Sequence, residues 1–143
     1  MFSTSHLHPL LVHFPIALVI FGFIAELAYL FFKRQVNLTT MGYYLLLAGT
    51  LAALAAWITG SFFTSEMDGA AGRIKETHEL FATITLVLLA ITSILRTALL
   101  VYKIENSSLK ALSFLLYALA AVSVSITGYL GGSLVYNYML GLN

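Results

Sequence analysis

Four long apolar runs, separated by short polar links, make up most of the chain. The runs cover roughly residues 8–32, 40–64, 76–102 and 109–131. At 1.5 Å of rise per residue, each run forms a helix long enough to cross about 30 Å of hydrocarbon. Short links make consecutive helices antiparallel neighbours. The pattern predicts an all-α integral membrane protein. We expect a four-helix up-down-up-down bundle of two tandem helical hairpins, forming a single transmembrane domain over residues 1–143.

The composition strengthens this prediction. The 143 residues are 60% hydrophobic and only 9% charged, whereas a soluble domain is about a quarter charged. A soluble core of this length could not bury so much apolar surface, so we expect a lipid bilayer to cover the rest. The net charge of +1 and the lack of a basic patch argue against nucleic acid as a partner. The absence of cysteine excludes disulfides, thiolate metal sites, iron–sulfur clusters and covalent c-type haem.

Charges in the links predict the orientation. One face carries mostly basic residues: Lys33, Arg34, Lys103 and Lys110, with Arg96 nearby and Glu105 opposing them. The other face is more acidic: Glu66, Asp68, Glu76 and Glu79 against Arg73 and Lys75. The positive-inside rule puts the basic face in the cytoplasm. We therefore expect a bacterial inner membrane protein with both termini and all four histidines on the periplasmic side. The first run lacks a preceding basic residue and a following cleavage site, so it is expected to be a retained helix.

Histidines are the candidate functional residues. Three lie close together at the start of the chain, at positions 6, 8 and 13, and the fourth, His78, opens the third apolar run. An imidazole near hydrocarbon needs a partner and is a functional candidate by default. The first and third helices are parallel and diagonal in such a bundle, so a histidine from each would point at the same central volume. Two imidazoles on opposite faces of one iron are what a b-type haem needs. A second such site would need two more histidines, so we expect a single haem b.

Which histidine of the first helix pairs with His78 is open. His13 lies deeper in the apolar run and is favoured as the axial partner. His8 precedes Pro9, a favoured first-turn residue, and is the alternative; otherwise it would be a helix-start residue or a propionate partner. The spacing from His8 to Glu26 equals that from His78 to Arg96, and both correspond to five whole helical turns. If Glu26 and Arg96 form an ion pair in the bundle, His8 lies level with His78.

A faint repeat points to further site residues. Ile58-Thr59-Gly60 near the end of the second helix matches Ile126-Thr127-Gly128 in the fourth. Gly60 and Gly128 would let a flat macrocycle approach the backbone. Tyr136 lies at the histidine end and could bond a propionate or a quinone oxygen, although an interfacial aromatic residue is the simpler interpretation. No catalytic motif is present, so an electron carrier or subunit is favoured over a stand-alone enzyme.

The opening and closing motifs resemble a bacterial family of four-helix membrane proteins of unknown function. His8-Pro9-Leu10-Leu11-Val12-His13-Phe14-Pro15-Ile16-Ala17 is similar to its HPxxVHFPIA opening, and Gly131-Gly132-Ser133-Leu134-Val135-Tyr136 to its terminal GGxLVY. His78 and Arg96 match its third-helix histidine and arginine. The chain departs from the family after Tyr136, where Asn137-Tyr138-Met139 replaces a basic-His-Gly run. Some members carry cytochrome c or Rieske-type modules, which implies redox work at the outer face.

These observations lead to two functional hypotheses. The first is a small membrane b-type cytochrome that carries electrons through a bis-histidine haem near the periplasmic face, with a c-type cytochrome or Rieske protein as partner. The second is a cofactor-free membrane anchor or structural subunit of a redox complex. Either could form a homo-oligomer.

Overall fold

The computed structural model describes residues 7–64 and 67–138, and it confirms the all-α four-helix membrane architecture. The helices are α1 (Leu7–Leu11), α2 (His13–Phe31), α3 (Asn37–Phe63), α4 (Gly69–Val101) and α5 (Ser107–Tyr138). Only Val12 separates the short α1 from α2. The four long helices are each long and apolar enough to cross a membrane. No strand occurs in the described residues.

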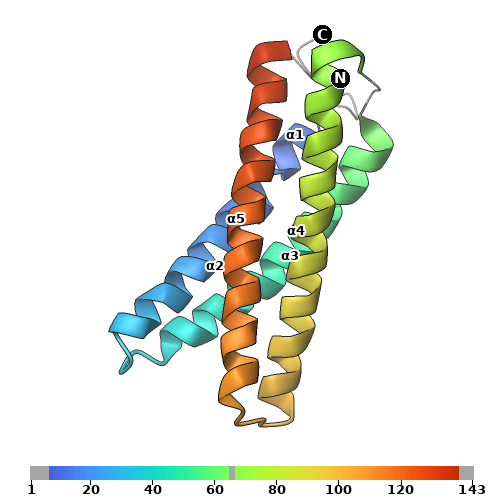
Figure 1. Ribbon diagram of the computed structural model, residues 1–143. Coiled ribbons are helices and arrows are strands. Elements are labelled where there is room, and N and C mark those ends of the chain that lie inside the picture. The colour runs from blue at the N-terminus through green and yellow to red at the C-terminus, as the bar shows by residue number, and fades with distance from the viewer. Residues whose placement is uncertain (1–6, 65–66, 139–143) are drawn as a thin grey trace.

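Two helical hairpins form the bundle (Figure 1). The first hairpin packs α2 against α3, and the second packs α4 against α5; these contacts are more extensive than those of α3 with α4 and of α2 with α5. The turns at 32–36 and 102–106 lie apart at one end of the molecule. The other end is where α1 begins, α3 ends, α4 begins and α5 ends. We call it the histidine end, because it holds His8 and His78.

Two helices are longer than the apolar runs predicted. The third begins at Gly69 instead of 76, because the charged residues before His78 continue the helix beyond its apolar part. Gly69 has a φ of 68°, a left-handed conformation that glycine adopts without strain, where the link enters the helix. The fourth continues to Tyr138 instead of breaking at 131, because glycine is tolerated where a transmembrane helix packs closely on a neighbour.

The core draws residues from all four long helices. Val19, Leu46, Leu89 and Tyr117 are fully buried. By contrast, many large apolar side chains lie on the outer surface, among them Phe31, which is 82% exposed. A soluble protein does not leave so large an apolar surface in water. The outer surface of the bundle therefore suits a lipid bilayer.

The buried positions repeat along the chain. The buried positions of α2 recur in α4, at the same spacing that separates Glu26 from Arg96. The buried positions of α3 recur in α5, at a spacing that is one residue longer. The α2 and α4 pairs are Pro15 and Thr85, Val19 and Leu89, and Gly22 and Thr92. The α3 and α5 pairs are Gly42 and Ser113, Leu46 and Tyr117, Gly49 and Ala120, and Ala53 and Val124. The predicted tandem repeat is therefore present. However, the two Ile-Thr-Gly tripeptides are separated by a shorter spacing than the buried positions, so aligning the hairpins on these tripeptides gives the wrong register.

Candidate functional site

His8 and His78 meet at the histidine end of the bundle. Their ring centroids are 6.2 Å apart and their planes are nearly perpendicular, at 82°. His8 comes from α1 and His78 from the third turn of α4, the two helices that start from this end. The fold thus brings together two rings from different hairpins, at positions that are equivalent in the repeat.

Each imidazole is held by a backbone carbonyl of the partner helix in its own hairpin. His8 Nδ1 lies 3.0 Å from the Ala56 carbonyl oxygen and 3.2 Å from Thr59 Oγ1. His78 Nδ1 lies 3.0 Å from the Thr127 carbonyl oxygen. A carbonyl only accepts hydrogen bonds, so each Nδ1 donates, and in the neutral ring Nε2 keeps its lone pair. Ala56 and Thr127 are related by the same spacing as the buried positions of α3 and α5, so the two anchors are equivalent in the repeat.

A glycine lies against each ring. A Cβ on Gly60 would be 2.9 Å from His8 Cε1, and a Cβ on Gly131 would be 3.1 Å from His78 Cε1. These two glycines are also equivalent in the repeat. Gly128, which the tripeptide match had paired with Gly60 as a site where a macrocycle could approach the backbone, lies against Ile16, with its Cβ position 2.9 Å from Ile16 Cδ1. The pair that packs on the histidines is therefore Gly60 and Gly131.

The structure brings His8, and not His13, next to His78. His13 is the first residue of α2, and its side chain is exposed. Five residues correspond to about 140° around a helix, so His13 faces a different direction from His8. Tyr136 is also exposed, at 87%. His6 lies outside the described residues.

Burial sets the electrostatics of His8, which precedes the first membrane-spanning helix. Burial lowers the pKa of His8 below its ordinary value, and the neighbouring His78 lowers it further. The hydrogen bond to Ala56 and the Glu79 carboxylate oppose this decrease. Glu79 is itself engaged by Lys75, whose Nζ lies 2.8 Å from Glu79 Oε1. The environment thus favours the neutral imidazole, which is the form that binds metals.

Two features of the imidazole pair can be compared with what a metal ion needs. Histidines that bind metals usually donate their other ring nitrogen to a carbonyl or carboxylate, as both Nδ1 atoms do here. Two imidazole nitrogens on one metal ion lie about 4 Å apart, given bonds of about 2 Å each. Allowing for the two rings, the 6.2 Å between centroids is of the size that such a pair requires. Among the described residues no group of three or more His, Cys, Asp or Glu could hold a metal ion.

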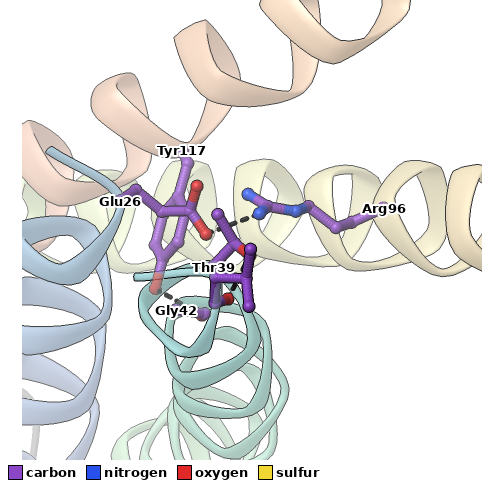
Figure 2. Close-up of polar contacts among 6 residues, drawn as sticks. Glu26, Thr39, Gly42, Arg96 and Tyr117 are labelled. Carbon is purple, nitrogen blue, oxygen red and sulfur yellow. Dashed lines mark hydrogen bonds and ion pairs between the residues drawn. The ribbon is translucent and has the colours of Figure 1, made fainter. Parts of the chain in front are cut away.

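A second polar site lies nearer the opposite end of the bundle (Figure 2). Arg96 Nη2 donates to Glu26 Oε1 at 2.5 Å, and both side chains are largely buried. The carboxylate fits against Gly42, where a Cβ would be 2.3 Å from Glu26 Oε1. Tyr117 OH donates to the Gly42 carbonyl at 3.4 Å. The ion pair between Glu26 and Arg96 is thus confirmed. His8 and His78, which lie the same number of turns before these two residues, are also side by side.

Sequence reasoning missed the carbonyl anchors and Gly131. Gly131 was taken as the end of a helix, because a Gly-Gly pair is a common break signal. The spacing from His8 to His78 would have located it to within one residue, since the same spacing counted from Gly60 ends one residue before Gly131. The one-residue difference arises because the repeat spacing is longer by one residue in α3 and α5 than in α2 and α4, which the sequence does not reveal.

Comparison with known proteins gives one family. No curated protein and no solved structure matches the chain. The family described as "Predicted membrane protein (DUF2231)" matches residues 4–143, nearly the whole chain. This agrees with the four apolar helices and with the resemblance of the opening and closing motifs. The chain therefore belongs to the DUF2231 family of membrane proteins, whose function is unknown.

Proposed function

We propose that the chain is a small membrane b-type cytochrome in which His8 and His78 hold a single haem b. The observation that carries this proposal is the meeting of the two imidazoles, each with Nδ1 bonded to a carbonyl. A bound haem supplies one-electron transfer. The protein residues fix the tautomer and orientation of the rings, and apolar helices around them exclude water.

The proposed orientation places this site at the periplasmic face of a bacterial inner membrane. The turns and their flanks carry four basic residues (Lys33, Arg34, Lys103, Lys110), and the histidine end carries two (Arg73, Lys75). The positive-inside rule supports a cytoplasmic position for the turns and a periplasmic position for the histidine end. A periplasmic c-type cytochrome or Rieske protein could then exchange electrons with the site from the aqueous side.

A second function is favoured by a different observation. Gly60 and Gly131 lie in contact with the rings, and the Nδ1 bonds give both histidines a structural role without a ligand. Histidines that only tie the hairpins together would suit a cofactor-free anchor or structural subunit of a redox complex. The two functions differ in whether the Nε2 atoms bind a metal.

A visible spectrum of the full-length protein, purified in mild detergent from haem-replete cells, separates the two. A b-type cytochrome gives a Soret band and, when reduced, sharp α and β bands. We expect His8→Ala and His78→Ala each to lose these bands, because each removes one axial ligand. His13→Ala is the matched control, and we expect it to retain the spectrum.

Two results count against the haem site as proposed. A folded wild-type protein with no Soret band, with or without added haemin, favours the structural subunit. A spectrum that survives His8→Ala but is lost in His13→Ala returns the axial role to His13.

A further inference from the structure

The two hairpins face each other through an approximate two-fold arrangement. The repeat relates α2 to α4 and α3 to α5, so the contact of α3 with α4 is equivalent to that of α5 with α2, and both contacts occur. In a two-fold interface, a residue near the axis meets its own equivalent. His8 meets His78 and Glu26 meets Arg96, and the two members of each pair are equivalent in the repeat. These residues therefore lie near the axis that relates the hairpins.

None of the buried equivalent pairs of α2 and α4 other than Glu26 and Arg96 differs in charge between the hairpins. The histidine pair consists of the same residue type in both repeats. Val19 and Leu89, equivalent and fully buried in one core cluster, are both apolar. The position of Glu26 and Arg96 is different, because one repeat carries an acid there and the other a base. Charge at this position therefore distinguishes the two hairpins.

Pairing of two identical hairpins would place like charges together at this position. Two copies of the first hairpin, packed by the same two-fold, would bring Glu26 against a second Glu26. Two copies of the second would bring Arg96 against a second Arg96. An uncompensated charge within the hydrocarbon is expensive, and like charges in contact are more so. The observed pairing, with Arg96 bonded to Glu26, avoids both costs.

We propose that the face between the hairpins is a pairing surface between two copies of one repeat unit, and that Glu26 and Arg96 select the opposite hairpin as the partner. Replacing a buried ion pair by neutral residues often leaves stability nearly unchanged, whereas polar residues at one position can fix which chains associate. The role of the pair is therefore specificity, through repulsion in the wrong pairing as well as attraction in the right one. This role is independent of whether haem binds.

The chain offers a clean reporter of the wrong pairing, because it contains no cysteine. Val19 shares one core cluster with its equivalent Leu89, so Val19→Cys would bring two thiols into one core only if two first hairpins paired. A disulfide between chains then reports the like pairing in the full-length protein. Cysteine is a small apolar residue and suits this buried position.

The experiment compares four full-length proteins that carry this reporter: the unmodified charge pair, Arg96→Glu, Glu26→Arg/Arg96→Glu and Glu26→Gln/Arg96→Gln. We expect no interchain disulfide with the unmodified pair. The neutral variant should stay folded and gain an interchain disulfide. Arg96→Glu should lower the melting temperature, and the exchanged pair should recover part of the loss. Exchange of the exposed Glu105 and Lys110 pair is the control and should change neither measurement.

Either of two results overturns the proposal. If the neutral variant forms no interchain disulfide, the charge pair does not select the partner. If the exchanged pair melts no higher than Arg96→Glu, the two charges are not matched to one another across the axis. If the Arg96→Glu protein does not accumulate, the yield of folded Glu26→Arg/Arg96→Glu protein replaces the comparison of melting temperatures. The disulfide test on Glu26→Gln/Arg96→Gln still decides whether the charges select the partner.

Discussion

Gly60 lies in direct contact with His8: a Cβ at this position would be 2.9 Å from His8 Cε1. The imidazole therefore occupies the space that any larger residue would need. The same relationship joins Gly131 to His78 in the second hairpin. Each ring packs against a glycine and donates a hydrogen bond from Nδ1 to a backbone carbonyl. Small changes in α3 or α5 should therefore move the histidine rings.

Gly60→Ala and Gly131→Ala should each destabilise the protein. The added methyl group forces the ring away from its carbonyl anchor, and such overpacking costs about 1–3 kcal/mol. Thermal unfolding in detergent measures the loss. If haem binds, the Soret band should also weaken, because the displaced ring is no longer aligned.

Gly132→Ala is the control for this prediction. A Cβ on Gly132 meets no atom within 4 Å, and the residue is helical. Alanine favours a helix by about 1 kcal/mol over glycine, so no destabilisation is expected. Equal losses in Gly131→Ala and Gly132→Ala would mean that contact with the ring is not the cause.

Gly42→Ala should break the ion pair between Glu26 and Arg96. The new methyl group would lie 2.3 Å from Glu26 Oε1 and must displace the carboxylate. Losing one partner of a buried pair costs about 3–5 kcal/mol. In a Glu26→Ala background the same substitution should cost much less. A double-mutant cycle of unfolding free energies measures this coupling, and additive effects would show that Gly42 acts independently of Glu26.

The sequence predicted the parts of this structure that depend on periodicity and length. Four apolar runs are enough to give four membrane helices and two hairpins, and the equal five-turn spacings correctly linked the Glu26 and Arg96 pair to the level of the histidines. The side chain that meets His78 depended on rotation about the helix axis. The apolar residues around His13 suggested that it lies deeper in the membrane, and this favoured His13 as the partner of His78. However, a side chain that faces lipid and one that faces the bundle core have similar apolar neighbours in the sequence.

The repeat failed for a related reason. Ile58-Thr59-Gly60 and Ile126-Thr127-Gly128 are identical tripeptides, but the contacts that define the fold relate Gly60 to Gly131. The offset between Gly128 and Gly131 is close to one helical turn, so a wrong register of this size preserves the face of the helix and looks plausible. The two registers are distinguished by the side chain that each glycine contacts: His8 for Gly60 and His78 for Gly131.

Acid should weaken the histidine end. Burial and the neighbouring His78 lower the pKa of His8, so the folded protein prefers the neutral ring. The unfolded chain binds a proton at about pH 6.5, so it holds more protons than the folded state below that value. The contribution of His8 to stability should be constant above about pH 7 and fall as the pH decreases through about 6.5 toward the lower folded-state pKa.

Melting temperatures between about pH 5 and pH 8, the range in which histidine titrates, test this expectation. Glu79 and Lys75 also face the site, and Glu79 opposes the shift. His8→Ala should therefore reduce the loss of stability in acid. A pH dependence identical in His8→Ala and in the unmodified protein would assign the effect to another group.

Thr50→Val and Ser93→Ala should have unequal effects, although they remove the same hydrogen bond. Thr50 Oγ1 lies 2.8 Å from Ser93 Oγ and also 2.8 Å from the Leu46 carbonyl, to which it donates. Ser93 then donates to Thr50. After Ser93→Ala, Thr50 keeps its acceptor, so the loss should be about 0.6 kcal/mol, as for an average interhelical bond in membranes. After Thr50→Val, the buried Ser93 hydroxyl loses its partner, and the loss should be about 1–3 kcal/mol. Unfolding free energies in detergent measure both, and a larger loss for Ser93→Ala would reverse the assigned direction of the bond.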